Sequence, residues 1–417
     1  MVPRLACLLL LFATVWAGLA SADEAGLPWP ATPSPAAAYA RAAAITALGR
    51  DLFFDPGLSA SGRVACATCH DPRFGFSPAN AQPVQPGGRA LDQPGTRAVP
   101  GLSYAQFSPF FTEHYFESEE DGDESIDNGP TGGLTWDGRA SRARDQARVP
   151  LLAPHEMANA SPAEVVAHVR AAPYAEVVRA LYGPAVFDRD DRAFDAITEA
   201  LETFQQDPAT FAPFSSKYDA WLNGRATLSA AEAHGLTLFE DQAKGNCAHC
   251  HKSRPTASGA LPLFTDFGFV ALGVPRNPAI QANADPAHFD LGLCGPDRTD
   301  LAGHPDYCGL FKAPSLRNVA VRKSFFHNGA MHSLRDAVAF YASRDTDPGR
   351  WYPRDAAGHV RKFDDLPAAY WENVNVEPPF DRHPGDPPAL TDAEIDDIVA
   401  FLGTLTDGWK PEDKVAP

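Results

Sequence analysis

Two short stretches decide the fold of this 417-residue chain: Cys66-Ala67-Thr68-Cys69-His70 and, much later, Cys247-Ala248-His249-Cys250-His251. Both follow the pattern Cys-x-x-Cys-His, in which two thiols add to the vinyl groups of a haem and the adjacent histidine ligates its iron. Seven cysteines and 13 histidines in this length would give about 0.004 chance matches to the pattern. A zinc site or a redox-active cysteine pair would leave the histidine after each pair unexplained. The sequence therefore predicts two covalently bound haem c groups.

The haem-binding residues follow directly from these motifs. Thiols come from Cys66 and Cys69 in the first motif and from Cys247 and Cys250 in the second. We expect His70 and His251 to be the iron ligands on one face of each haem, and His249 to be a bystander.

A helical pattern leads into each motif. Residues 39–54 carry apolar side chains at helical spacing, and Ser229 with Glu232 forms a capping box that opens a helix running into the second motif. The same capping signature recurs at residues 161–164 and 391–394. Strand-like alternation is scarce. We predict a mainly α fold with two cytochrome c-like domains, residues 23–208 and 209–417, and many ordered loops.

The first 22 residues resemble a secretion signal. Arg4 supplies the positive end, residues 5–19 the apolar stretch, and Ala20-Ser21-Ala22 a cleavage site. A membrane anchor is the alternative, but the apolar stretch is shorter than the roughly 20 residues that a spanning helix needs. We expect a cleaved signal peptide, residues 1–22, no membrane insertion, and export to a bacterial periplasm.

Removal of Cys7 with the signal leaves six cysteines, four of them in the two motifs. In an oxidising compartment, Cys294 and Cys308 most simply form a disulfide. It would close a loop of about 15 residues and contribute about 3 kcal/mol in the chain-entropy model.

The charge balance excludes some classes of function. Lysine and arginine number 35 against 53 acidic residues, a formal net charge of −18. Non-specific nucleic-acid binding and docking on an anionic membrane both need clustered cations. We interpret the acidic stretch 117–127 as a solvated loop. The alternative is a calcium site or a docking patch for a basic partner, although the spacing of the acidic residues does not match an EF-hand.

Two haems in one exported chain fit either electron transfer or catalysis, and the sixth ligand of each iron decides between them. Methionine and histidine are the usual sixth ligands. After export only Met157 and Met331 remain, so methionine ligands are scarce.

Three further stretches resemble the bacterial dihaem cytochrome c peroxidases, and most closely their MauG branch. They are FKAPSLRNVAVRKSFFHNGAMHSLRDAVAFY (311–341), LTWDGRA (134–140) and LAPHEMA (152–158). The resemblance covers nearly all of the mature chain. It implies two cytochrome c-like domains packed with their haems at the domain interface.

The resemblance also assigns roles to individual residues. It implies that Tyr341, where the peroxidase branch has methionine, ligates the haem of His251. Glu156 matches a distal carboxylate above the haem of His70, which is then the peroxide site, and can act there as a general acid–base. Gln146 matches a neighbouring pocket position, and Trp136 matches a tryptophan that relays electrons between the haems. His327 also fits the family, in a packing or haem-propionate role.

The match fails at two places. The family's calcium ligands align with Ala98, Arg322 and Ser324, so bound calcium is doubtful, and Arg322 is a candidate to occupy the charge site itself. The surface tryptophan through which MauG exchanges electrons aligns with Gly245. Any partner protein must then be oxidised through another exit, with Tyr218 or Trp221 as candidates.

The resemblance implies a haem-dependent oxidoreductase acting with peroxide. Our first hypothesis is that hydrogen peroxide generates a high-valent two-haem state, which oxidises a tryptophan or tyrosine side chain of a partner protein, as MauG-type enzymes do. A subgroup that converts a partner's tryptophan to kynurenine is one version of it. The second hypothesis is a cytochrome c peroxidase that detoxifies peroxide with electrons from a small cytochrome. A non-catalytic dihaem electron carrier is the third.

Overall fold

The computed structural model describes residues 34–117 and 124–411. The predicted signal peptide and residues 118–123 of the acidic stretch lie outside this part of the chain. The chain divides into two compact units, Met1–Arg41 and Ala42–Pro417. Residues 34–41 of the first unit include the first turns of helix α1, and the rest of the described chain belongs to the second unit.

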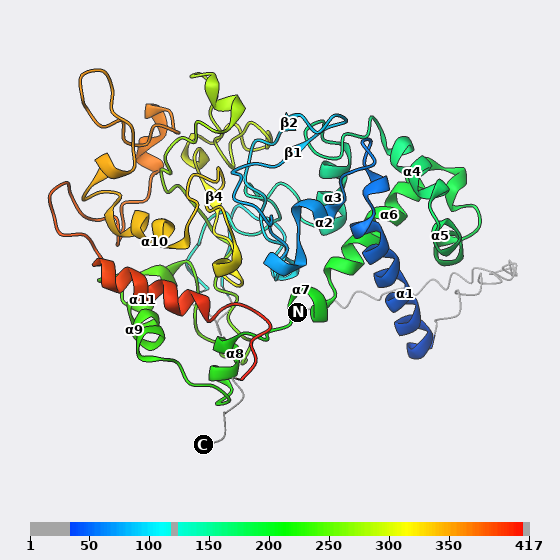
Figure 1. Cartoon of the computed structure of the whole chain (residues 1–417), viewed down its shortest axis with the longest axis horizontal. Coiled ribbons are helices and arrows are strands. Elements are labelled where there is room, and N and C mark those ends of the chain that lie inside the picture. Colours follow the sequence, from blue (N-terminus) through cyan, green and yellow to red (C-terminus); the bar gives the residue numbers. More distant parts are fainter. Residues whose placement is uncertain (1–33, 118–123, 412–417) are drawn as a thin grey trace, which may run out of the picture. The chain divides into compact units, whose positions relative to one another are not determined.

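Helices joined by long loops make up the described chain (Figure 1), as the sequence predicts. The helices are α1 (Pro35–Phe54), α2 (Cys66–Cys69), α3 (Ala143–Leu152), α4 (Pro162–Ala171), α5 (Ala175–Tyr182), α6 (Asp190–Gln205), α7 (Pro208–Phe211), α8 (Lys217–Leu222), α9 (Ala230–Glu240), α10 (Leu334–Ser343) and α11 (Asp392–Gly403). The strands are β1 (Pro86–Gly87), β2 (Gln93–Pro94), β3 (Phe269–Val270) and β4 (Phe311–Lys312). They form two antiparallel pairs, β1 with β2 and β3 with β4. No helix of residues 34–117 and 124–411 is long and apolar enough to cross a bilayer.

Two hydrophobic cores occupy successive parts of the chain. The first runs from Ile45 to Phe211 and includes the buried faces of α3, α4 and α6. The second runs from Tyr218 to Leu405 and is built around α9, α10 and α11. The predicted boundary between residues 208 and 209 falls within α7, whose Phe211 still packs in the first core. The assignment of one haem domain to each core stays a prediction.

The helix that leads into each cysteine motif crosses a partner helix at a glycine. A Cβ on Gly49 of α1 would lie 1.9 Å from the carbonyl oxygen of Ala200 in α6, and one on Gly235 of α9 would lie 2.0 Å from that of Asp397 in α11. Figure 1 shows α9 and α11 side by side. Because no side chain fits between the backbones, both crossings are closer than ordinary helix packing allows. The two cores therefore repeat one arrangement.

Two of the three predicted capping boxes are confirmed. Ser229 and Glu232 cap α9 reciprocally, and Thr391 and Glu394 cap α11 in the same way. At α4 the prediction is wrong. Ser161 is the N-cap residue, but its side chain accepts no hydrogen bond from the helix. Glu164 instead accepts from the Ala160 amide at 2.6 Å and pairs with Arg89.

Candidate functional site

The first cysteine motif forms a single helical turn that ends on its histidine. α2 contains Cys66 and Cys69, and the His70 amide donates to the Cys66 carbonyl at 2.9 Å. The His70 ring donates from Nδ1 to the carbonyl oxygen of Phe76 at 3.0 Å. Since a carbonyl can only accept, Nδ1 carries the proton and Nε2 is left free to bind a metal.

The second motif repeats this geometry with different residues. The His251 amide donates to the Cys247 carbonyl at 2.9 Å, and its Nδ1 donates to the carbonyl oxygen of Phe264 at 2.8 Å. Burial lowers the pKa of both imidazoles, that of His70 to about 4. Both rings are therefore neutral, with Nε2 available as a ligand.

Both motifs open onto one cavity of about 730 Å³. The lining includes the four cysteines of the two motifs, which take part in no disulfide, and both histidines. Four cysteines outside any disulfide and two oriented imidazoles around one large cavity fit two haem c groups. The residues present are thus those that the sequence assigns to haem attachment.

Tyr341 lines the same cavity from α10. Its ring lies between those of Phe326 and Phe380, with centroids 6.1 and 5.4 Å away. Among the described residues, its hydroxyl has no hydrogen-bond partner. Burial raises its pKa, and the neighbouring Cys250 and Cys247 add to that rise. The phenol therefore lies on the second motif's side of the cavity with an unused oxygen.

Glu156 lines the cavity from the turn that follows α3. Its carbonyl accepts from the Gly88 amide at 2.8 Å, so the β1–β2 hairpin supports this turn. Its Oε1 lies 3.7 Å from His155 Nε2. Burial raises the pKa of Glu156 to about 7; Arg139 opposes this rise, and Asp297 adds to it. Gln146 lines the cavity from α3 itself.

Trp136 is buried against the cavity wall. Its indole Nε1–H donates to the Ala98 carbonyl at 2.7 Å, and its own carbonyl accepts from the Lys312 amide at 2.9 Å. These bonds fix the ring between segments of the two cores. The structure thus brings Trp136, Glu156, Gln146 and Tyr341 to one cavity.

A buried ionic cluster beside Trp136 was missed by sequence reasoning. Asp137 is fully buried and accepts from Arg97 and Arg139 at 2.5 and 2.7 Å. Arg97 also donates two hydrogen bonds to the Asp290 carboxylate, from Nε at 2.6 Å and from Nη2 at 2.7 Å. Buried charges are tolerated when paired in this way. The aspartate in the WDGR stretch was the one available signal.

One of the residues aligned with the family's calcium site, Arg322, places its guanidinium among polar groups. Arg322 Nη1 donates to Ser77 Oγ at 2.8 Å, and Nη2 reaches the carbonyl oxygens of Val99 and Ser324 at 3.1 and 3.5 Å. Burial lowers its pKa to about 10. The candidate role of Arg322 in place of a metal ion stays a prediction.

The predicted exits for electrons lie beside the second motif. Tyr218 is buried and donates to the Ser253 carbonyl at 2.9 Å, and its ring centroid lies 5.2 Å from that of the half-buried Trp221. At Gly245 a Cβ would lie 2.7 Å from the Leu238 carbonyl oxygen. The backbone therefore leaves no room there for a tryptophan.

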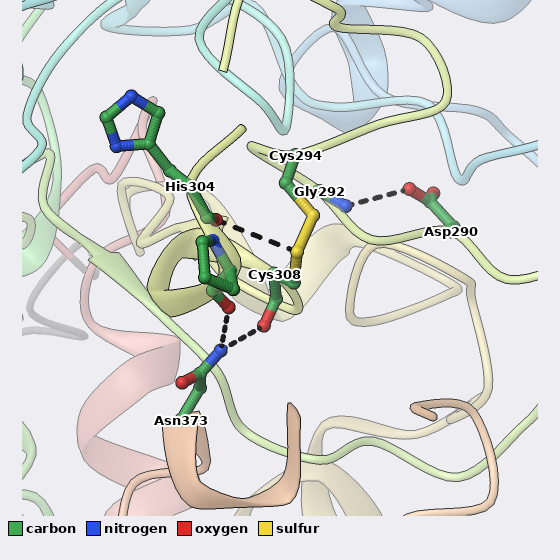
Figure 2. Close-up of a disulfide and its surroundings, with 7 residues drawn as sticks. Asp290, Gly292, Cys294, His304, Cys308 and Asn373 are labelled. Carbon is green, nitrogen blue, oxygen red and sulfur yellow. Dashed lines mark hydrogen bonds between the residues drawn. A yellow bond between two sulfur atoms is a disulfide. The ribbon is translucent and has the colours of Figure 1, made fainter. Parts of the chain in front are cut away.

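The predicted disulfide between Cys294 and Cys308 is confirmed. Figure 2 shows its surroundings: the Asn373 amide donates to the Pro305 and Cys308 carbonyls at 2.8 and 3.0 Å, and the Gly292 amide donates to Asp290 at 3.1 Å. Hydrogen bonds therefore hold both ends of the closed loop.

A mainly helical chain with two haem-attachment motifs around one cavity defines a dihaem c-type protein. Comparison with known proteins makes the class specific: residues 43–227 match the model of the family described as di-haem cytochrome c peroxidase. The methylamine utilization protein MauG of Paracoccus denitrificans is 35% identical over 375 residues, which cover 87% of this chain and 89% of MauG. The chain belongs to the di-haem cytochrome c peroxidase family, and it is a haem-dependent oxidoreductase that acts with peroxide.

Other relatives span both kinds of enzyme in the family. The cytochrome c551 peroxidase of Nitrosomonas europaea is 28% identical over 298 residues, 70% of each chain. The crystal structure of the dihaem peroxidase BthA from Burkholderia thailandensis matches with a TM-score of 0.77 and 40% identity, covering 90% of this chain and 87% of BthA. A tyrosine-to-methionine variant of BthA matches with a TM-score of 0.78 and 41% identity, over 88% and 86% of the two chains. Membership implies two haem cofactors and either a protein substrate or a donor cytochrome.

Proposed function

We propose that the chain is a periplasmic dihaem enzyme that uses hydrogen peroxide to oxidise a tryptophan or tyrosine side chain of a partner protein. The observation that carries the proposal is the unpartnered hydroxyl of Tyr341, on the second motif's side of the cavity. A phenolate is a hard anionic ligand and favours higher-valent iron, whereas a thioether favours the ferrous state. The 35% identity to MauG supports the same assignment.

In this proposal Cys66 and Cys69 attach the first haem, with His70 as its ligand, while Cys247 and Cys250 attach the second. Haem iron with an open position supplies the two-electron reduction of peroxide. Glu156 takes a proton from the near peroxide oxygen and returns it to the far one, which leaves as water. Its pKa of about 7 suits both transfers.

Two further residues complete the proposed machinery. Gln146 faces the same cavity as Glu156 and is assigned to orient the peroxide. Trp136 is assigned to pass an electron between the two haem sites, and its bond to the Ala98 carbonyl holds the indole in one orientation. The reaction consumes two electrons and two protons per peroxide and forms two waters. The electrons come from the partner side chain.

A cytochrome c peroxidase that removes peroxide is the second candidate. The observation in its favour is that several relatives at 27–28% identity are named cytochrome c peroxidases. In that case a small cytochrome supplies the electrons and no partner side chain is altered.

The deciding experiment adds one equivalent of hydrogen peroxide to the purified diferric holoprotein without an electron donor. Mössbauer and near-infrared spectra then follow the oxidation state of both haems. We expect both haems to be oxidised above the ferric level for minutes. Tyr341→Met should abolish this state, and Glu156→Gln should slow its formation by 100-fold or more.

Tyr352→Phe is the matched control, because Tyr352 is a buried tyrosine of the same core whose hydroxyl donates to the Gly273 carbonyl. It should behave as the wild type. The BthA variant indicates that a tyrosine-to-methionine change can leave this fold intact. Oxidation of a single haem with rapid decay, or no reaction before reduction, would favour the second candidate.

A further inference from the structure

The disulfide-closed loop of the second core reaches across to the WDGR stretch of the first. Three of its charged side chains make the contact. Asp290, at its base, accepts two hydrogen bonds from Arg97, and Arg298 Nη1 donates to the Asp137 carbonyl at 2.9 Å. Asp297 Oδ2 lies 3.4 Å from Arg139 Nη1.

The loop is held rigidly at this place. The Cys294–Cys308 bond closes it, and Figure 2 shows the Asn373 and Asp290 hydrogen bonds at its base. The Arg298 guanidinium is buried, with its carbon 3.7 Å from the centroid of the Phe111 ring, and it pairs with Asp300. The position of Asp297 is therefore set by neighbours on both sides in the sequence.

Asp297 lines the same cavity as Glu156 and acts electrostatically on it, raising its pKa. Both residues line the 730 Å³ cavity, as do His155 and Arg139. The groups that face Glu156 are His155 from its own turn, Arg139 from the WDGR stretch, Asp297 from the disulfide loop, and the thiols of the first motif. Asp297 is the acidic member supplied by the second core.

Arg139 has three carboxylates within its electrostatic reach. It bonds to Asp137 at 2.7 Å and approaches Asp297 at 3.4 Å. Arg97 faces both of these carboxylates as well, with its Nη1 2.5 Å from Asp137 and 3.7 Å from Asp297. If Asp297 were neutral, the guanidinium would turn towards the remaining carboxylate, Glu156, because an ion pair between arginine and a carboxylate is favourable. A carboxylate paired with arginine would lose affinity for the peroxide proton.

We propose that Asp297, carried by the Cys294–Cys308 loop, is a positioning residue of the peroxide pocket that holds the Arg139 guanidinium away from Glu156. This inference rests on the proposed role of Glu156. In this proposal the disulfide also supports the pocket, because without it the loop would hold the Asp297 carboxylate less firmly beside Arg139.

The test is an infrared pH titration of the holoprotein that follows the carboxylic-acid C=O band lost in Glu156→Gln. In the wild type we expect a midpoint near 7. Asp297→Asn should lower it by about one pH unit, and Asp297→Glu should restore it. The pH at which the rate of peroxide reaction reaches half its maximum should fall by the same amount.

Asp306→Asn is the matched control. Asp306 is an exposed residue of the same loop, so this change removes the same charge without altering the pocket. Its midpoint should equal that of the wild type. The Cys294→Ser, Cys308→Ser double variant should shift the midpoint in the same direction as Asp297→Asn. Should that double variant fail to fold, the Asp297→Asn titration decides alone.

An unchanged midpoint in Asp297→Asn, or an equal shift in Asp306→Asn, would overturn the inference. The infrared titration does not depend on peroxide chemistry, so the two proposals fail separately. If Asp297→Asn shifts the band while Glu156→Gln reacts with peroxide at the wild-type rate, the positioning role stands and the proposed acid–base role of Glu156 falls.

Discussion

Replacing Gly87 by alanine should displace Glu156 without touching any group that reacts. Gly87 is the second residue of β1 and is buried against the turn that carries Glu156. An added Cβ would lie 2.2 Å from the His155 carbonyl oxygen, 2.6 Å from that of Glu156, and 2.7 Å from the Glu156 Cα. All three atoms belong to the backbone, so no side-chain rotation relieves the overlap.

The size of the displacement follows from these distances. Real Cβ atoms essentially never approach a heavy atom closer than 3.0 Å, so the His155 carbonyl must retreat by at least 0.8 Å. Overpacking of this kind costs about 1–3 kcal/mol of stability. A shift near 1 Å in a catalytic group lowers a rate by about 100-fold. The Glu156 backbone is itself one of the crowded groups, so its carboxylate should move with the turn.

Stopped-flow absorbance measures the rate at which the diferric holoprotein reacts with peroxide. We expect Gly87→Ala to slow this rate by about 100-fold while haem content stays at the wild-type level. Gly303→Ala is the control, because a Cβ there meets no atom within 4 Å. If Gly87→Ala reacts as fast as Gly303→Ala, the turn does not position Glu156 and the reasoning fails.

Three other changes have defined outcomes. Arg317 and Asp219 form a buried two-bond ion pair at 2.8 and 2.9 Å, so Asp219→Ala should cost about 3–5 kcal/mol of unfolding free energy in urea. Arg73→Ala, at the exposed Arg73–Asp71 pair, is the control and should change that free energy far less. Burial disfavours the charged form of Asp137, but its two arginine partners outweigh this and hold its pKa at about 2. That pKa lies below the unfolded value of about 3.9, so the ionised carboxylate stabilises the protein by on the order of 2 kcal/mol above about pH 4. This stabilisation is lost as the pH falls towards 2. In urea unfolding, the free energy of Asp137→Asn should therefore fall less between pH 4 and pH 2 than that of the wild type. Trp136→Phe removes the indole and its hydrogen bond to the Ala98 carbonyl. In the Mössbauer experiment the second haem should then stay ferric after peroxide addition. Equal oxidation of both haems would show that Trp136 does not relay electrons.

Local features of the site were predictable from the sequence. The Cys-x-x-Cys-His motif contains its own turn, and in both copies the histidine amide closes that turn on the first cysteine. Capping at Ser229 succeeded because Ser229 and Glu232 bond to each other's backbone. At Ser161 no capping box forms: the Glu164 carboxylate accepts from the Ala160 amide, one residue before the cap, and the serine side chain accepts no hydrogen bond from the helix. Competition from an outside cation does not explain the difference, because Glu232 and Glu394 pair with Lys217 and Lys244 and still complete their capping boxes.

Distant pairings had no sequence signal. Arg97 and Asp290 are 193 residues apart, and nothing around either residue distinguishes it from the other 34 cations or 52 acids of the chain. The disulfide could be inferred from cysteine counting, but the direction of its loop could not. That direction depends on where Arg298 and Asp290 find partners in the first core.

The two haem sites therefore differ through residues that their motifs do not contain. Each motif presents its histidine in the same way, as a neutral imidazole whose Nδ1 is held by a backbone carbonyl and whose Nε2 would be available to the iron. In the proposed function the other side would be supplied by Glu156, from the turn after α3, at one site and by Tyr341 of α10 at the other; both residues line the cavity. A carboxylate with a pKa near 7 can exchange protons at neutral pH, whereas a phenolate is a ligand for higher-valent iron in the proposed function. If the division of labour between the haems arises in this way, exchanging the motifs should leave it unchanged, and exchanging the residues that face them should not.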